Sequence, residues 1–161
     1  MKTTLNKIRK YEPCAAGWQK LLTYLGKTKA DDEPLSLLTI LDSNGLDDAL
    51  WCLRAVEGHD REIRLYAVWC ARQVQHLLTD QRSLDALDVA ERYANGEATD
   101  DELTSAWSAA RSAAWSAAAT RATASAAADA AWGARASSWA AGVEMKQRQE
   151  AELRRICEEV E

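Results

Sequence analysis

The chain has 161 residues, 47% of them hydrophobic and 28% charged, so it is long enough to form one globular domain with a sizeable core. No apolar run approaches the roughly 20 residues of a membrane-spanning helix, and the basic residues near the start are not followed by the apolar stretch of a secretory signal. We therefore expect a cytoplasmic protein without a membrane segment. The four cysteines lack the close pairing of a disulfide-rich secreted domain, which favours reduced thiols.

The charge is distributed unevenly along the chain. Residues 1–30 contain seven bases and one acid, whereas residues 31–102 contain six bases and seventeen acids. A protein that binds DNA or RNA needs basic residues to neutralise phosphates, so the acidic centre argues against direct contact with nucleic acid. A protein partner with a basic surface remains compatible with this charge.

Helix-forming periodicity runs through nearly the whole sequence. Leu, Ala, Trp and Val recur at steps of three and four residues, with only two prolines and no sustained alternation of β-branched residues. This pattern predicts an all-α fold, a compact multi-helix array in a single domain over residues 1–161. Residues 99–161 are expected to form Ala/Trp-rich helices that pack on an array formed by residues 1–98.

The first predicted helix carries Trp18, Leu21, Leu22 and Leu25 on one face and ends at Gly26. The segment "DDEP", residues 31–34, predicts the start of a second helix, because acids and proline favour a first turn.

The second helix is expected to end at Asn44-Gly45, and a third covers residues 46–56. Asp60 is a candidate cap for a helix over residues 61–78, and Ser83 for one that ends at Asn95-Gly96. The segment "TDDE", residues 99–102, matches a capping box, in which a threonine and a glutamate each satisfy a backbone N–H of the same helix start.

The segment Trp-Cys-x-Arg occurs twice, as residues 51–54 and 69–72. On a helical wheel Cys70 falls at the centre of an apolar stripe, Trp69 lies at its flank, and the nearby arginines face the polar side. The earlier copy has the same order of apolar, aromatic and polar faces. We interpret the repeat as two antiparallel helices that pack in similar surroundings, each with its cysteine buried as a small hydrophobic residue.

A zinc site is the alternative reading of this repeat, since Cys52, His59, Cys70 and His76 are all residues of ligand type. Their separations of seven, eleven and six residues lack the close pairs of structural zinc sites. His76 also lies on the wheel away from the stripe of Cys70. The sequence therefore predicts no metal site and no cofactor.

The sequence carries none of the common catalytic signatures, such as a G-x-S-x-G segment, a glycine-rich phosphate loop or an H-E-x-x-H segment. The acidic clusters at residues 31–33, 47–48 and 100–102 consist of residues that can hold Mg²⁺ or act as paired acid and base. All three stand at predicted helix starts, however, where carboxylates complement the helix dipole, and this is the preferred interpretation. We expect a protein that is not an enzyme. The candidate partner-binding residues are acids that form an exposed face and arginines on the opposite polar face: Asp31, Asp32, Glu33, Asp47, Asp48, Arg61, Arg64 and Arg72.

The last third of the chain is alanine-rich, with nineteen alanines among residues 106–141. One uninterrupted helix of this length is about 54 Å long, so we expect a break. The threonines and serine of residues 120–125 compete for backbone hydrogen bonds and mark the predicted turn of an Ala-faced helical hairpin. Burial in this hairpin is the simpler expectation for its tryptophans, and any that stay exposed form a binding surface. These tryptophans are Trp107, Trp115, Trp132 and Trp139.

The runs "DDEPLSLLTILDSNGLDDALWCLRAV", "DREIRLYAVWCARQVQHL" and "ALDVAERYANGEAT", followed by an Ala/Trp-rich tail, resemble the Imm5-like family of immunity proteins from bacteria, phages and prophages. The resemblance covers nearly the whole chain and is most specific over residues 12–103. It implies a small cytoplasmic α-helical protein that neutralises a partner by binding it. No catalytic or binding residue is implied by the resemblance.

Two functions follow as hypotheses. The first is an immunity protein, or antitoxin, that binds a toxin and covers its active site. The second is a phage anti-defence inhibitor, similar in role to an anti-CRISPR protein, whose acidic surface blocks a host nuclease or nucleic-acid-binding complex. The two differ in the expected salt dependence, because binding to a basic groove weakens steeply as salt rises. The sequence leaves the identity of the partner and the existence of a homodimer open.

Overall fold

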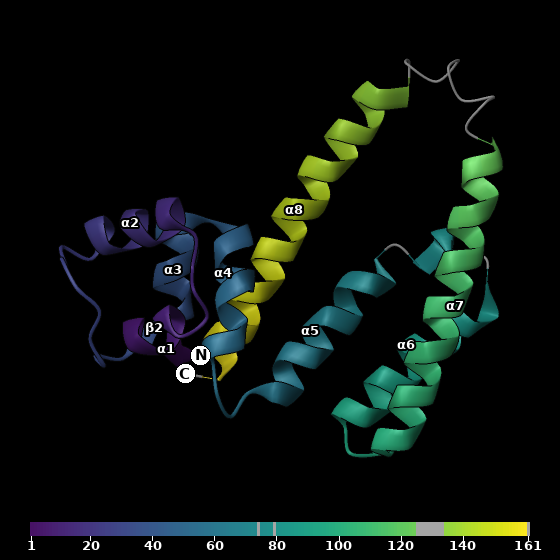
Figure 1. Ribbon diagram of the computed structural model, residues 1–161, viewed down its shortest axis with the longest axis horizontal. Helices are drawn as coiled ribbons and strands as arrows, with labels where there is room; N and C mark the ends of the chain where they lie inside the picture. Colours follow the sequence, from purple (N-terminus) through teal and green to yellow (C-terminus); the bar gives the residue numbers. More distant parts are fainter. Residues whose placement is uncertain (74, 79, 125–133, 161) are drawn as a thin grey trace. The chain divides into compact units, whose positions relative to one another are not determined.

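The structure is a computed structural model that describes residues 1–73, 75–78, 80–124 and 134–160. Side chains are described for all of these residues except residue 77 and those of residues 113–142. The described chain contains eight α-helices, two short 3₁₀ helices and two strands of two residues each (Figure 1). The prediction of an all-α, multi-helix fold is confirmed.

Short helices dominate the first half of the described chain, and the two longest helices lie in the second half. In chain order the elements are β1 (Lys2–Thr3), α1 (Leu5–Arg9), α2 (Ala15–Tyr24), β2 (Leu35–Ser36), α3 (Leu37–Asn44), α4 (Leu46–Cys52), η1 (Leu53–Ala55), α5 (Asp60–Arg72), η2 (Gln75–Leu77), α6 (Gln81–Ala94), α7 (Asp100–Ala124) and α8 (Ala134–Glu159).

The chain divides into two compact units. Unit 1 contains residues 1–60 and 150–161, and unit 2 contains residues 61–149. Helix α8 therefore contributes its last part to unit 1 and its first part to unit 2. The single domain over residues 1–161 stays a prediction.

The core of unit 1 is formed by apolar residues from α1, α3 and the last part of α8. Leu5, Ile40 and Leu153 are each at most 1% exposed, and Arg154 of α8 donates to the carboxylate of Asp42 at 2.6 Å. Because these buried residues come from both ends of the chain, their packing depends on contacts between segments far apart in the sequence.

Strand β2 corrects the predicted start of the second helix. Its two residues pair with β1 in antiparallel register, and the hydroxyl of Ser36 accepts a hydrogen bond from the backbone N–H of Leu38. Helix α3 therefore begins at Leu37, and the prediction that residues 31–34 form a helix start was wrong. The strand pair keeps Leu35 and Ser36 extended, and Ser36 is also the cap, so a helix cannot begin before Leu37.

The ends of the other helices in unit 1 lie closer to the residues predicted from the sequence. Helix α2 ends before Gly26, whose φ of +65° lies in the left-handed region that glycine adopts easily. Helix α3 ends at Asn44, as predicted. Helix α4 ends at Cys52 and continues as the 3₁₀ helix η1, so the helix predicted for residues 46–56 is α-helical only in its first part.

In unit 2, α5 ends at Arg72, whereas the sequence predicted a helix to residue 78. Helix α6 begins at Gln81 because the carboxylate of Asp80 accepts from the backbone N–H of Arg82, so Asp80 and not Ser83 caps this helix. Its predicted end at Asn95-Gly96 is confirmed.

The capping box at the start of α7 is confirmed. The backbone N–H of Thr99 donates to the Glu102 carboxylate at 2.8 Å, and the N–H of Glu102 donates to the Thr99 hydroxyl at 3.2 Å. Helix α7 runs to Ala124, so residues 120–124 are helical and the break predicted within residues 120–125 does not occur in them. Residues 125–133, and the side chains of Trp115, Trp132 and Trp139, lie outside the described part of the chain.

Candidate functional site

The predicted binding arginines of α5 have partners on α6 or on the residue that follows it, and Arg61 also stays exposed. Arg61 donates to the side-chain oxygen of Asn95 at 2.9 Å. The guanidinium of Arg64 lies over the ring of Tyr93, 4.6 Å from the centroid.

Arg72 donates to the carboxylates of Asp88 at 2.8 Å and Glu91 at 2.5 Å. These two hydrogen bonds hold the pKa of Arg72 above its usual value. The three arginines therefore link two helices of unit 2, which is a structural role within the chain.

These contacts also explain why the two Trp-Cys-x-Arg segments differ. Cys52 is 4% exposed, as predicted, but Cys70 is only half-buried, so the prediction of a shared buried thiol was wrong for the second copy. Arg54 lies over the ring of its neighbour Trp51 at 4.4 Å, whereas Arg72 reaches across to α6. Helix α5 thus contacts α6 through residues of its polar face as well as packing through its apolar stripe. The two copies of the segment therefore lie in different surroundings.

The acids of residues 31–33 form a cluster around one lysine. Lys27 lies 2.7 Å from Asp31 and 2.6 Å from Glu33, and its ammonium group lowers the pKa of Asp31. The third acid, Asp32, accepts a hydrogen bond of 3.4 Å from the hydroxyl of Thr4. One of the three negative charges that suggested a binding face is therefore balanced by Lys27.

Asp47 and Asp48 lie in the first turn of α4, as predicted, but in different surroundings. Asp47 is exposed. The carboxylate of Asp48 is half-buried and accepts a hydrogen bond of 2.7 Å from the side-chain amide of Asn44, which also donates to the backbone carbonyl of Gly17. Asp47 is thus a surface residue, whereas Asp48 is partly buried and hydrogen-bonded to a neighbouring helix.

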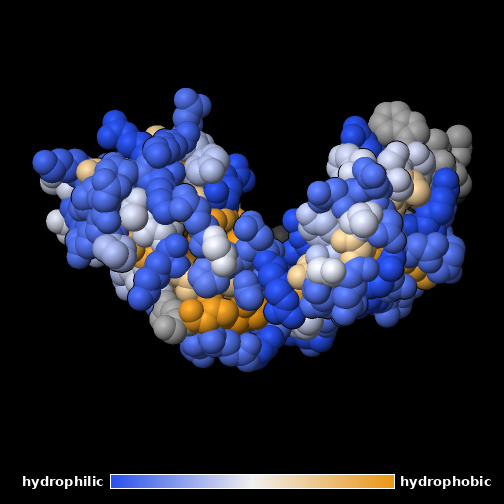
Figure 2. Space-filling view, turned by 90° about the horizontal axis from the view of Figure 1, so that it is seen from below, coloured by the Kyte–Doolittle hydropathy of each residue, from blue (hydrophilic) through white to orange (hydrophobic). Residues whose placement is uncertain are grey.

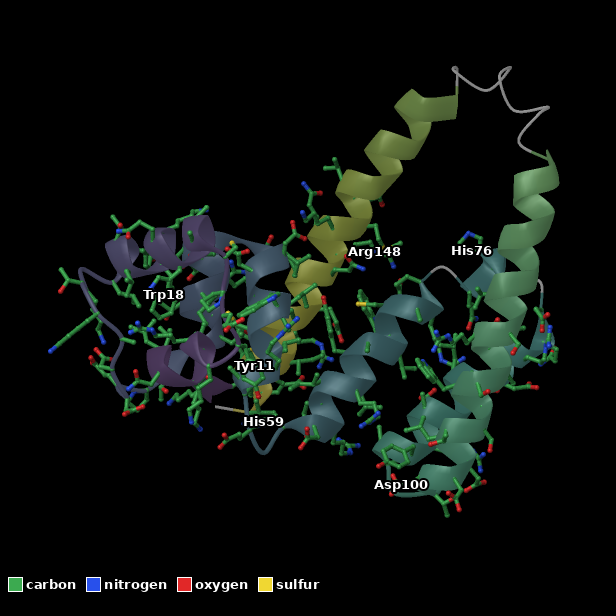
Figure 3. All side chains as sticks on the ribbon, in the orientation of Figure 1. Tyr11, Trp18, His59, His76, Asp100 and Arg148 are labelled. Carbon is green, nitrogen blue, oxygen red and sulfur yellow. The ribbon has the colours of Figure 1, made fainter. Side chains whose placement is uncertain are left out.

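Asp48 lines a pocket of about 100 Å³ in unit 1, formed by residues of α1 to α4. Trp18, which Figure 3 shows between α2 and α1, and Trp51 of α4 supply its aromatic lining. Cys14 and Cys52 also line it. Trp18 is far from Asp48 and Trp51 in the sequence, and only the fold brings the three side chains to one pocket.

The thiols of this pocket differ in their chemistry. Burial, with a contribution from the negative charge of Asp48, raises the pKa of Cys52 to about 12, so this thiol stays protonated at neutral pH. Cys14 is exposed and its sulfur accepts a hydrogen bond of 3.4 Å from the backbone N–H of Gly17 at the start of α2. Within the described residues, no group of three or more His, Cys, Asp or Glu side chains is arranged to hold a metal ion.

Unit 2 carries a wider groove of about 520 Å³ between α5, α6 and α7. Its lining is mainly apolar and includes Val68, Leu87 and Leu103, and Trp107 stands at the groove with 63% of its surface exposed. In Figure 2, hydrophobic residues of unit 2 interrupt a face that is otherwise hydrophilic. Of the tryptophans expected in the alanine-rich hairpin, Trp107 is thus exposed.

Of the residues that the structure describes, Arg64 is the one charged residue that lines this groove, and its guanidinium lies over Tyr93, whereas the segment beside the groove is acidic. Residues 80–102, which form α6 and the start of α7, contain eight acids and two bases. Asp101 is exposed and lies in the helical turn that precedes Leu103 and Thr104 of the groove lining. An apolar groove beside an acidic helix start fits a partner that combines apolar and basic residues.

Comparison of the chain with protein-family models, with curated protein sequences and with solved structures finds no match. In the described part of the chain, no helix combines the length and the apolar composition of a membrane span. The geometry of unit 1 and of unit 2 therefore carries the functional argument.

Proposed function

We propose that this protein is a small, non-catalytic binding protein of the immunity type, which neutralises a protein partner in the cytoplasm by direct contact. The single observation that carries the proposal is the apolar groove of unit 2 with the exposed indole of Trp107 beside it. The resemblance of the sequence to the Imm5-like family points to the same role.

The groove supports binding because it leaves apolar surface and an exposed indole in contact with water. Leu87 of α6 and Leu103 of α7 are partly exposed beside the buried Val68 of α5, and tryptophan is among the residue types enriched in binding hot spots. Arg111, one turn further along α7, lies 5.4 Å from the Trp107 ring and leaves most of the indole accessible.

The proposed occupant is a segment of the toxin whose apolar residues enter the groove and whose basic residues face α6 and the start of α7. The negative charge of α6 and the start of α7 supports a basic partner. Arg72, Arg82 and Arg92 form ion pairs with acids of this region, but Glu97 and Asp101 lie exposed. A basic partner therefore gains electrostatic attraction in addition to apolar contact.

The same acidic charge favours one alternative. A phage or prophage inhibitor that occupies the basic groove of a host nuclease or nucleic-acid-binding complex also requires clustered acids beside an apolar contact. The two functions separate by the identity of the bound protein. A protein that is encoded beside this chain and arrests growth when it is expressed alone indicates the immunity function, and a host nuclease or nucleic-acid-binding complex indicates the anti-defence function.

Site-specific cross-linking in the native host tests the proposal. A photo-reactive amino acid at position 104, in the groove, is expected to capture a toxin-like protein, whereas the same amino acid at exposed position 105, which points away from the groove lining of α7, is not. The captured protein must arrest growth when it is expressed alone. Capture of a second copy of this chain, or equal capture from both positions, contradicts the proposal.

A further inference from the structure

The pocket of unit 1 combines two indoles with one carboxylate. Its volume of about 100 Å³ is roughly three times the 30 Å³ that one water molecule occupies in the liquid, so it accommodates a group of several heavy atoms. Trp18 reaches it from α2 and Trp51 from α4, while Asp48 lies in the first turn of α4. The pocket is therefore aromatic and anionic at the same time.

Asp48 differs from most acids of unit 1 in its partners. Lys27 neutralises Asp31, Lys7 neutralises Glu57 and Arg154 neutralises Asp42.

Within the described residues, by contrast, Asp48 forms no ion pair and accepts only the hydrogen bond from Asn44. Lys20, the lysine that reaches Asn44, donates to its backbone carbonyl at 3.4 Å and not to Asp48. Asp48 is therefore a half-buried carboxylate that lines the pocket and has no cationic partner among the described residues.

The remaining lining excludes an anionic ligand. No lysine, arginine or histidine lines the pocket among the residues that the structure describes, so Asp48 supplies its only formal charge. The indoles add the negative faces of their π systems, which attract cations. Arg54 already lies over the Trp51 ring at 4.4 Å, but Arg54 does not line the pocket.

We propose that this pocket binds an alkylammonium group, with Asp48 as its counterion and Trp18 and Trp51 in contact with the carbons attached to nitrogen. An aromatic lining with one carboxylate is the chemistry by which proteins recognise ammonium groups that carry alkyl substituents. The group has two possible sources, a free small amine or a lysine side chain of a protein. This proposal is independent of the groove in unit 2.

A titration of the purified full-length protein tests this pocket. The probes are choline, its neutral isostere 3,3-dimethyl-1-butanol, and n-butylammonium, each added at constant chloride concentration. The readout is the indole N–H signals in the ¹H–¹⁵N NMR spectrum, assigned by single Trp-to-Phe variants. We expect the signals of Trp18 and Trp51 to shift and saturate with a charged probe, and the neutral isostere to bind at least tenfold more weakly.

A matched pair of variants isolates the carboxylate. Asp48→Asn keeps the shape of the side chain and its bond with Asn44 but removes the charge, and Asp47→Asn removes the same charge from the neighbouring exposed position. We expect Asp48→Asn to weaken binding of the charged probes at least tenfold and Asp47→Asn to change it less than twofold. Equal effects of the two variants overturn the proposal.

The neutral isostere keeps the test decisive even if Asp48→Asn fails to fold, because that comparison uses the wild-type protein. Equal binding of choline and its isostere, shifts spread over all seven indoles, or no saturation overturns the proposal. Two further probes distinguish the sources: N-acetyl-lysine amide and its trimethylated form. Tighter binding of either one than of choline assigns the pocket to a lysine side chain, and the reverse order assigns it to a free amine.

Discussion

The guanidinium of Arg64 lies over the ring of Tyr93, 4.6 Å from the centroid, and this contact joins α5 to α6. Arg72 also bonds α6, and Arg61 bonds Asn95, the residue that follows this helix. The three arginines thus have partners within the chain, and their role in binding a partner protein stays a prediction. The apolar groove of unit 2 is lined in part by these same two helices.

Replacement of Arg72 by alanine is expected to lower the free energy of unfolding by about 1 kcal/mol, because the side chain is partly buried and bonds two carboxylates of α6. Arg82→Ala is the control, since its ion pair with Asp80 is exposed and local to the start of α6, and the expected loss is smaller than for Arg72→Ala. Urea unfolding measures both. A larger loss for Arg82→Ala contradicts the structural role of Arg72.

Removal of the capping box is expected to destabilise the start of α7. Thr99→Ala takes away the hydroxyl that accepts from the Glu102 N–H, and the expected loss is about 1 kcal/mol. Ser108→Ala, an exposed substitution inside the same helix, is the control and is expected to leave stability unchanged or slightly higher. Thermal unfolding of the two variants compares them; similar melting temperatures speak against the cap.

The pH dependence of stability is expected to include a contribution from Glu102. Bonds from the backbone and side chain of Thr99 lower the pKa of Glu102 in the folded protein below its ordinary value of 4.5. A lowered pKa stabilises the fold fully above 4.5, and this stabilisation is lost as pH falls through the folded value. Glu102→Gln should therefore make the unfolding free energy less steep below pH 4.5, and an unchanged slope would contradict this assignment.

Gly17→Ala is expected to destabilise unit 1 although alanine normally favours a helix. The added Cβ would lie 2.7 Å from a carboxylate oxygen of Asp48 and 3.2 Å from the sulfur of Cys14, so the bond between Asp48 and Asn44 must shift. We expect a loss of about 1 kcal/mol from this crowding. In an Asp48→Ala background the same substitution should be neutral or stabilising; a loss of equal size there contradicts the close approach.

The thiols are expected to react in a definite order. Cys14 is exposed, whereas Cys52 is buried and its pKa is raised to about 12, so a thiol reagent at pH 8 should modify Cys14 first. Cys52 should react only after the protein unfolds. Mass spectrometry of the partly modified protein identifies the site, and early modification of Cys52 would contradict its burial.

Features that depend on neighbouring residues in the chain were predictable from the sequence. The end of α2 at Gly26 and the capping box of Thr99 and Glu102 follow from local backbone and hydrogen-bond preferences. The all-α fold follows from helical periodicity over the whole chain.

Features that depend on distant residues were not predictable. Helix α3 begins late because β2 pairs with β1, more than 30 positions earlier in the chain, and no local signal of "DDEP" shows this pairing. A helical wheel likewise identifies the polar face of α5, but not that Tyr93 and Asp88 of α6 will cover it. The pocket and the groove each join three or more helices, so only the folded chain places their residues together.

The most direct test of the proposed neutralising function is growth of cells that express the protein captured through position 104. Co-expression of the wild-type chain is expected to restore growth, and Trp107→Ala is expected to abolish this protection. Tyr24→Ala, which removes an aromatic residue that is 59% exposed in unit 1, should protect as well as wild type at equal expression. Full protection by Trp107→Ala, or no protection by the wild-type chain, would contradict neutralisation through the groove.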